Sequence, residues 1–556
     1  MTFLRGGHWL AGTQLLLWLA VILAAVLIRK LKAQGIPILP HSLIFGHMLI
    51  AADFSKENPA DINFTQFQSW LFRNFKRYFA DLVHLPPVVY FDIWPVLAFP
   101  VAFVYNTRSA AQAFQIKNLP KHSLGRNFLD PLTHQRDLST IHGEEWKFWR
   151  SKFNPGFSPR NITALVPELI KEIEVFVEVL RQLAGKDGSW GPVFQLEKKT
   201  VNLTFDVIIW AILNKRLHEQ TNPTNSPLKR ALADQARIMA IGRHAGQVFT
   251  WKRMPWHTRA AARNNRIMHD FFMPEVQRIL HSQGETSQQD KKTALGLALQ
   301  PTTYPELDTE KTTSSLSPDT ETLESIMSHL KILIFAGYET TAAAVCWMFK
   351  LLQDHPDSMA KLRSEHDAIF GPDPDDAAGI LTQSPQLLNS LHYTTAVIKE
   401  TLRLYPLAGS LREGEAGFCM TAPGSSTEYP TDGFIVWQGS AGIQRDPALW
   451  PRADEFVPER WLVMDTEDPL YPVKEAWRPF SWAPRVCIGM ELAISDIKLV
   501  ASLVARRFDI EEAWDEWDAQ RGPNCSKDTV DGQRLYAVGE GTVHPKDKMP
   551  VHGRLR

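Results

Sequence analysis

Cys487 is the residue of this sequence whose surroundings point most directly to chemistry. It stands near the end of the stretch Phe480-Ser-Trp-Ala-Pro-Arg-Val-Cys487-Ile-Gly489, in a predicted tight turn that precedes an apolar, helix-like run. Free N–H groups at the start of that helix would favour a thiolate, because a helix N-terminus stabilises negative charge. A thiolate in such a turn is a candidate axial ligand for haem iron, where it favours cleavage of the O–O bond of dioxygen. Considered alone, the stretch also fits a structural cysteine.

Two neighbours of Cys487 extend the cofactor interpretation. Arg485, two residues before the cysteine, could bind an anionic propionate of the macrocycle. Gly489, two residues after the cysteine, lets the backbone approach a flat ring, because glycine has no side chain. One short segment could therefore supply an iron ligand, a cation and space for a ring.

A second candidate site is the stretch Ala336-Gly337-Tyr-Glu339-Thr340-Thr341, in the middle of a predicted buried helix. An acid and a hydroxyl are costly to bury without partners, and Gly337 lowers helix propensity without an evident gain in packing. One interpretation is a groove over a cofactor, in which Glu339 and Thr340 relay protons. The alternative is a helix kink, in which the Thr340 hydroxyl bonds to a carbonyl one turn earlier.

Two further stretches could form a buried charge cluster. In Glu400-Thr-Leu-Arg403 the spacing puts acid and base on one helix face, as on many surface helices. The turn Phe456-Val-Pro-Glu-Arg460-Trp461 could bring Arg460 to the same carboxylate. A carboxylate held by two guanidinium groups would anchor the fold.

The hydrophobic pattern predicts a mainly α fold with minor β sheet around these residues. Apolar residues go nearly all round the predicted helix over 325–352, which is typical of a core helix. Further helices are predicted over 390–404, 488–507 and most of 143–280, and short strands within 88–104 and 407–438. Residues 284–322 are rich in Ser, Thr, Gln, Lys and Glu, and we interpret them as a polar surface insertion.

The N-terminal segment has the composition of a membrane anchor. Residues 8–28 are almost wholly apolar, and about 30 Å of helix would cross a bilayer core. Basic residues follow at once, which places the bulk of the chain in the cytosol. The chain then divides into a single transmembrane helix at 8–28, a basic, proline-rich hinge at 29–60 and a globular domain at 61–556. A cleaved signal peptide is the alternative.

Composition excludes several classes of protein. The 556 residues carry a net charge of −1, with 60 basic and 61 acidic residues, so nothing favours a nucleic-acid partner. The four cysteines form no CxxC pair, which argues against a disulfide scaffold or a zinc module. No convincing G-x-G-x-x-G fingerprint is present, so electrons for redox chemistry would have to come from a partner.

Together and in this order, the four stretches resemble the cytochrome P-450 family of haem-thiolate monooxygenases, from about residue 39 to the C-terminus. The resemblance implies a cytochrome P-450 fold and haem b as cofactor. It makes Cys487 the axial ligand of the haem iron, packs Phe480 near it, and assigns proton delivery to Thr340 and Glu339. It makes Glu400, Arg403 and Arg460 a structural triad.

The resemblance also implies further haem contacts. Trp146-Lys-Phe-Trp-Arg150 is similar to the family's Trp-x-x-x-Arg helix, whose Trp146 and Arg150 hold a haem propionate, and Arg412 matches another propionate-binding position. His142 is one more candidate, with a helix cap as the alternative. One position departs from the family, since Ala483 replaces a glycine; if it needs positive φ, the cost is about 1 kcal/mol.

The resemblance implies an enzyme that hydroxylates, epoxidises or further oxidises a hydrophobic small molecule with O2. The substrate would be lined by residues 120–130, 241–256, 334–341 and 407–411. Electrons would come from an NADPH-dependent diflavin reductase on the endoplasmic reticulum membrane, and the sequence texture is similar to fungal enzymes of polyketide or terpenoid metabolism. The alternatives are a reductant-independent haem-thiolate isomerase or dehydratase, and a non-enzymatic membrane haem-binding protein. An intact Glu339-Thr340 pair favours the monooxygenase.

Overall fold

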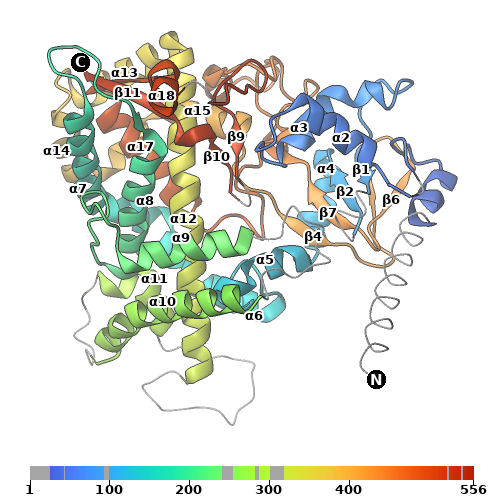
Figure 1. Ribbon diagram of the computed structural model, residues 1–556, viewed down its shortest axis with the longest axis horizontal. Helices are drawn as coiled ribbons and strands as arrows, with labels where there is room; N and C mark the ends of the chain where they lie inside the picture. The colour runs from blue at the N-terminus through green and yellow to red at the C-terminus, as the bar shows by residue number, and fades with distance from the viewer. Residues whose placement is uncertain are drawn as a thin grey trace.

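A single long helix, α12 (Thr320–Asp354), runs through the helical part of the protein (Figure 1). The computed structural model describes residues 26–556 apart from 43, 93–98, 241–253, 282–286, 288, 301–318, 523–524 and 540–541. The N-cap Asp319 accepts a hydrogen bond from the backbone N–H of Thr322, which satisfies one free donor of the first turn. The helix is buried over most of its length, which confirms the predicted core helix and extends it at both ends.

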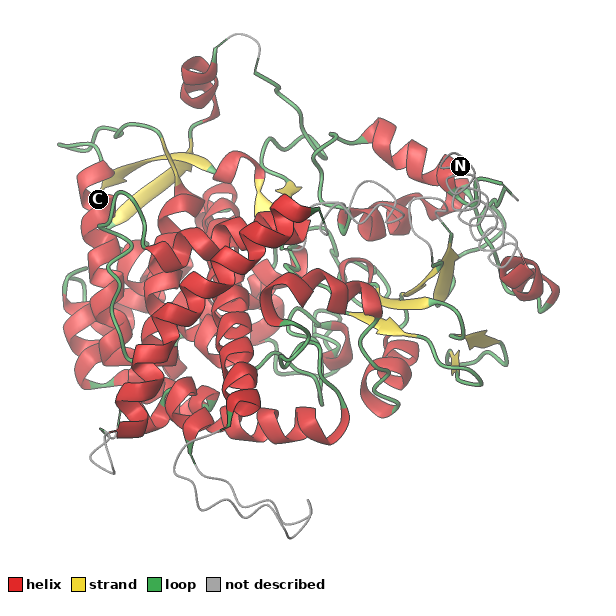
Figure 2. Cartoon of the chain, turned by 60° about the horizontal axis from the view of Figure 1, so that its bottom comes forward, coloured by secondary structure: helices red, strands yellow, loops and turns green. Residues whose placement is uncertain are grey.

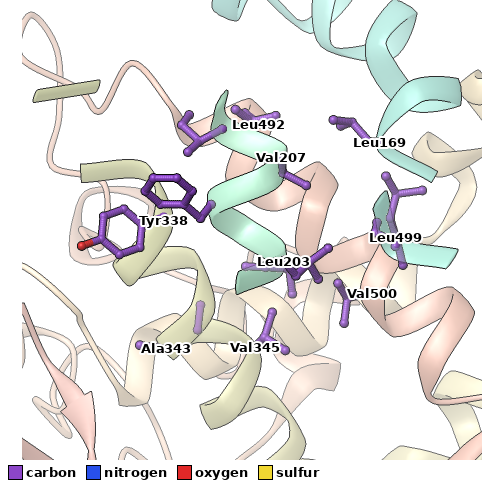
Figure 3. Packing of buried hydrophobic residues seen from close by; sticks show 14 of the residues in the cluster. Leu169, Leu203, Val207, Tyr338, Ala343, Val345, Leu492, Leu499 and Val500 are labelled. Carbon is purple, nitrogen blue, oxygen red and sulfur yellow. The ribbon is translucent and has the colours of Figure 1, made fainter. Parts of the chain in front are cut away.

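Three helices that are far apart in the sequence pack around α12. They are α8 (Leu196–Leu213), α15 (His392–Leu404) and α17 (Met490–Val504), and α7 (Pro159–Leu183) lies behind α8 and α17. Figure 3 shows how Leu203 and Val207 of α8 come together with Val345 of α12 and Val500 of α17. Because each of these side chains is buried, they fix the spacing between the helix that carries Thr340 and the helix that follows Cys487.

The other helices complete a mainly α architecture, as predicted, and the strands form separate small sheets near the C-terminus, near the centre and on the opposite side of the molecule (Figure 2). They are α2 (Met48–Glu57), α3 (Gln66–Asn74), α4 (Thr107–Ala111), α5 (Ser123–Thr133), α6 (Gly143–Phe153), α9 (Pro227–Ala240), α10 (Pro255–His281), α11 (Ala294–Leu299), α13 (Pro356–Phe370), α14 (Asp376–Gln383), α16 (Ser440–Ile443) and α18 (Trp514–Arg521).

The main sheet brings two distant parts of the chain together in the order β1-β2-β7-β4. Its strands are β1 (Val88–Phe91), β2 (Val101–Val104), β7 (Ile435–Gln438) and β4 (Leu411–Glu413). β2 and β7 are parallel, whereas the two outer pairs are antiparallel. An isolated bridge joins Lys121 to Arg412, so the segment before α5 lies against β4. The predicted strands within 88–104 and 407–438 are confirmed.

Three smaller sheets are formed by the remaining strands. They contain β3 (Phe194–Gln195), β11 (Pro550–Leu555) and β8 (Phe508–Glu512); β9 (Ala537–Val538) and β10 (His544–Pro545); and β5 (Cys419–Thr421) and β6 (Glu428–Pro430). β10 lies against α12, which places the residues around His544 beside the middle of the core helix.

The predicted insertion at 284–322 is only partly correct. The structure forms α11 within it, and Ala294, Leu295 and Ala298 of this helix are buried. Gly296 permits the close turn, because a Cβ there would lie 1.9 Å from the carbonyl oxygen of Asp290. The short apolar run Ala-Leu-Gly-Leu-Ala-Leu is hidden among polar neighbours in the sequence, and its burial depends on contacts with α6 and α8.

The predicted membrane anchor at 8–28 lies outside the described residues except for 26–28, so it stays a prediction. Within the described part of the chain, α12 is the helix that is long and apolar enough to cross a membrane. Because 78% of its apolar window is buried inside the protein, it is a core helix here.

Gly337 has a packing role that the sequence did not reveal. A Cβ at this position would lie 2.8 Å from Cδ1 of Ile208 on α8. The absence of a side chain therefore lets α8 approach α12 closely, and the statement that Gly337 brings no gain in packing was wrong. The neighbouring Ala336 is exposed, although it stands in the middle of this buried helix.

We expect Gly337→Ala to lower the stability of the protein by about 1 kcal/mol, because the overpacking cost of about 1–3 kcal/mol exceeds the gain in helix propensity. Gly379 in α14 is the matched control, since no atom lies within 4 Å of its added Cβ. Gly379→Ala should raise stability by up to about 1 kcal/mol. Thermal unfolding of both variants measures this, and a stabilising Gly337→Ala would contradict the packing role.

Candidate active site

Glu400, Arg403 and Arg460 form a fully buried ion cluster, as the spacing indicated. Arg403 donates from Nη2 to Oε1 and from Nε to Oε2 of Glu400, at 2.8 and 2.9 Å. Arg460 donates from Nε to Oε1 at 3.1 Å, and Trp461 donates from Nε1 to Oε2 at 3.0 Å. All three ionic side chains are 0% exposed, so each charge relies on the others.

Gln444 connects this cluster to the segment that carries the cysteine. Its Nε2 donates to the carbonyl oxygens of Leu402 and Arg403 at the end of α15. Its Oε1 accepts from the backbone N–H of Arg478 at 2.7 Å, two residues before Phe480. Gln444 therefore fixes the start of the cysteine segment against α15.

The cysteine segment closes on itself and is held by α6. The backbone N–H of Cys487 donates to the carbonyl oxygen of Phe480 at 2.9 Å. Arg150 donates from Nη1 to the carbonyl oxygen of Val486 at 2.9 Å, which ties α6 to the residue before the cysteine. Ser481 adopts φ 60°, whereas Ala483 does not have positive φ, so the conditional cost considered for alanine does not arise.

Cys487 keeps accessible surface although it lies at the start of α17 and beside α6. Burial raises the pKa of the thiol, and the Gly489 N–H and the charge of Arg150 only partly offset this. The thiol therefore has open space beside Sγ and many protein atoms around the rest of the side chain. An added Cβ on Gly489 would lie 4.0 Å from Sγ, at ordinary van der Waals distance.

The middle of α12 exposes one short face. Ala336 is exposed and Thr340, one turn later, is half-buried, although the helix is otherwise mostly buried. Thr340 donates from Oγ1 to the carbonyl oxygen of Ala336 at 2.8 Å, the bond expected for the kink alternative. The hydroxyl oxygen can still accept a hydrogen bond, so this geometry is compatible with a proton relay.

The Glu339 carboxylate forms hydrogen bonds on another side of α12. Its Oε1 accepts from the hydroxyl of Tyr338 at 2.9 Å, and its Oε2 accepts from the hydroxyl of Thr542 at 3.0 Å. The side chain is 15% exposed. Its partners thus account for the burial of a carboxylate in a core helix.

Four basic side chains converge near the cysteine segment: Lys121, Arg412, Arg485 and His142. Nε and Nη2 of Arg412, Nε of Arg485 and Nε2 of His142 are buried and have no hydrogen-bond partner among the described residues. Arg485 lies 4.0 Å above the ring of Trp146, which orients the guanidinium group. Lys121 donates to the hydroxyl of Ser410 at 2.8 Å.

The electrostatics of this cation cluster favour an anionic ligand. Burial lowers the pKa of Arg412 to about 10. Burial and then the charge of Arg412 lower the pKa of Arg485 to about 9. Burial, Arg412 and Arg485 lower the pKa of Lys121 as well, and Asp137 opposes this shift. Buried donors without acceptors are costly, so an anion with several oxygens fits this site, and the two propionates of haem have that chemistry.

The sequence-predicted cofactor residues lie together, with one difference in contacts. Arg412, Arg485 and Trp146 meet in the cation cluster, and Phe480 and Gly489 flank Cys487. Arg150 donates from Nη1 to the carbonyl oxygen of Val486 and from Nε to Oδ1 of Asn154. Its observed hydrogen bonds are therefore with the cysteine segment and with the end of α6. Its propionate contact stays a prediction.

The predicted substrate-lining stretches contribute accessible and apolar positions. Phe128 of α5 is half-buried, Ala336 of α12 is exposed, and Ala408 and Gly409 before β4 are exposed. Of the predicted stretch 241–256, residues 241–253 lie outside the described residues.

Sequence reasoning missed four functional candidates: Lys121, Gln444, Thr542 and His544. Each acts through a partner far away in the chain, such as Thr542 with Glu339, and none stands in a recognisable spacing. A single sequence carries no local signal for such contacts.

The chain resembles the same group of known proteins in sequence and in structure. A family model described as Cytochrome P450 matches residues 62–530. The cytochrome P450 monooxygenase polC of Polytolypa hystricis is 34% identical over 534 residues, which covers 95% of this chain and 91% of the relative. The cytochrome P450 monooxygenase acrF of Aspergillus aculeatus is 29% identical over 490 residues, which covers 83% and 92%.

Two solved structures share the fold. A crystal structure of a cytochrome P450 (CYP102L1) superposes with a TM-score of 0.68 at 18% identity, covering 89% of this chain and 99% of the other. The cytochrome P450DA heme domain gives a TM-score of 0.66 at 19% identity, covering 94% and 96%.

The buried ion cluster generates a stability prediction. Glu400→Gln leaves two guanidinium groups buried without a counter-charge, and we expect it to cost about 3–5 kcal/mol. Glu455→Gln is the matched control, because Glu455 pairs with Arg452 at the surface, where a pair contributes about 0–1 kcal/mol. Unfolding midpoint and haem content of purified protein measure both; equal effects of the two variants would contradict the anchoring role.

Proposed function

The chain belongs to the cytochrome P450 family and is a haem-dependent monooxygenase, and we propose that it oxidises a hydrophobic small molecule of fungal secondary metabolism, of the polyketide or terpenoid class. The observation that supports an apolar substrate is the exposure of apolar positions in the predicted lining stretches: Ala336 and Ala408 are exposed and Phe128 is half-buried. The fungal relatives polC and acrF support the biological setting.

The protein's own residues have distinct roles in this activity. Haem, when bound, supplies the iron that activates dioxygen. Cys487 would hold the iron through Sγ, and Arg412 and Arg485 would hold the propionates through their unpaired nitrogen atoms. The backbone N–H of Gly489 favours the thiolate, and Arg150 holds the backbone before the cysteine.

Protons would reach the reaction through polar residues in the middle of α12. Thr340 offers a hydroxyl at the accessible turn, and Glu339 stands beside it with hydrogen-bond partners on both carboxylate oxygens. The overall reaction consumes substrate, O2, NADPH and one proton, and releases oxidised substrate, NADP+ and water. We propose an NADPH-dependent diflavin reductase as the electron donor, since the sequence has no convincing dinucleotide fingerprint.

The proposed setting is the endoplasmic reticulum membrane, with one N-terminal span and the catalytic domain in the cytosol. The apolar run at 8–28 and the basic residues after it support this proposal. Carbonate extraction of microsomes should leave the full chain in the membrane pellet, and release into the supernatant would exclude a spanning anchor.

Microsomes that contain the chain and its reductase test the oxidation directly. We expect NADPH, 18O2 and a panel of apolar polyketides and terpenoids to give a product with one 18O atom. Conversion without NADPH would contradict the proposal and favour an isomerase or dehydratase.

Thr340→Ala tests the proton route. We expect the yield of peroxide per NADPH to rise several-fold, because a positioned proton donor is lost. Thr340→Ser keeps the hydroxyl and should restore the wild-type yield. Identical peroxide yields for wild type and Thr340→Ala would leave Thr340 as a helix-kink residue only.

A further inference from the structure

Glu339 is the end of a chain of hydrogen bonds that crosses three elements. The hydroxyl of Thr542 donates to Oε2 of Glu339 at 3.0 Å and lies 2.9 Å from Nε2 of His544. On the other side of the ring, Nδ1 of His544 lies 2.6 Å from Oε1 of Glu197 on α8. The four side chains therefore connect α8 to the middle of α12 through the segment before β10.

The hydrogen bonds from His544 to Glu339 share one donor-to-acceptor direction when His544 is protonated. Only the imidazolium ring donates from both nitrogen atoms, to Glu197 from Nδ1 and to Thr542 from Nε2. The Thr542 hydroxyl then accepts from His544 and donates to Glu339, so the two bonds between His544 and Glu339 point the same way, whereas the bond to Glu197 points away from them. A proton that leaves His544 can pass through one hydroxyl to the carboxylate beside Thr340.

The accessible surface identifies the entry point. The His544 side chain is 26% exposed, whereas Glu339 is 15% exposed and Glu197 only 1%. The most accessible ionisable member of the chain therefore lies one hydroxyl away from Glu339. Proton exchange with solvent is easiest at this position.

The His544 ring is held firmly in place. Its backbone pairs with Val538 of β9, and a Cβ on Gly539 would lie 2.9 Å from Cδ2 of the ring. Gly539 adopts φ +91°, and its carbonyl oxygen accepts a hydrogen bond from Nδ2 of Asn63 at 2.7 Å. Both features keep the ring nitrogens aligned with Thr542 and Glu197.

The surrounding charges support a protonated ring near neutral pH. Burial lowers the pKa of His544, but the hydrogen bond to Glu197 and the charges of Glu197 and Glu339 outweigh it and raise the pKa above 6.5, while Lys548 opposes them. These carboxylates come from α8 and α12, and Lys548 comes from the turn before β11.

We propose that His544 takes protons from solvent and recharges Glu339 through Thr542 during each turnover. His544 is a positioning residue in this scheme, because it acts through Glu339 and touches neither substrate nor cofactor. Each transfer moves one proton and no electrons, and solvent returns the proton to the ring. The inference rests on the proposed proton route through Glu339 and Thr340.

Peroxide yield per NADPH, measured with reductase and without added substrate, tests the relay between pH 6 and 9. In wild type we expect the yield to rise as the pH passes the pKa of His544. His544→Gln and Thr542→Val should give a yield that is several-fold higher at low pH and independent of pH. His552→Gln on β11 is the control, and its profile should equal that of wild type. A wild-type profile in His544→Gln would overturn the proposal.

Thermal unfolding provides a second readout that needs no turnover. The folded pKa of His544 is raised, so its stabilising contribution is complete below pH 6.5 and is lost as the pH rises through the folded pKa. The difference in unfolding midpoint between wild type and His544→Gln should therefore shrink from pH 6 to pH 9. A constant difference would overturn the proposal, since the ring would then not be charged.

The two readouts separate the relay from its premise. Thr542→Val should keep the pH-dependent stability of wild type, because His544 is still present. Its peroxide yield should nevertheless rise, because the hydroxyl that connects His544 to Glu339 is lost. A purely structural role of His544 does not produce this combination. If wild type oxidises no NADPH with the reductase, the proposed electron source fails, and the unfolding experiment still decides whether His544 is charged.

Discussion

The buried contact between Glu400 and two guanidinium groups is the constraint on which the active site depends. Because none of the three charges reaches solvent, the segments that carry them cannot separate without exposing uncompensated charge to an apolar interior. Arg403 also donates to the carbonyl oxygens of Gln444, Ala453 and Glu455. One side chain therefore connects several segments of irregular backbone. Irregular backbone needs such partners, since it has no ladder of its own. Gln444 connects the cysteine segment to this ion cluster and thereby fixes the position of the segment.

A second principle is the uneven distribution of charge around the site. On the cofactor side, Arg412 and Arg485 are buried with nitrogen atoms that have no acceptor among the described residues, which favours an anionic ligand. On another side of α12, the half-buried Glu339 and the buried Glu197 have hydrogen-bond partners on their oxygens. The cations and the carboxylates therefore lie on different sides of the core helix.

Local patterns in the sequence predicted much of this arrangement. The Glu400–Arg403 pair and the core helix were predicted because each depends on helical spacing. Cys487 was singled out by its neighbours within a few residues, and its role as a ligand stays a prediction. Gly337 was misjudged because its partner, Ile208, lies on another helix. The helix α11 was missed because its burial depends on α6 and α8 rather than on its own composition. Lys121, Gln444 and His544 gain their roles only from tertiary contacts, which a single sequence does not contain.

The most direct test of thiolate ligation by Cys487 is the absorption spectrum of the reduced, CO-bound protein. We predict a strongly red-shifted Soret band in the full chain, lost in Cys487→Ala and retained in Cys525→Ala. An unshifted band in the wild-type protein, or a shifted band that survives in Cys487→Ala, would contradict the assignment.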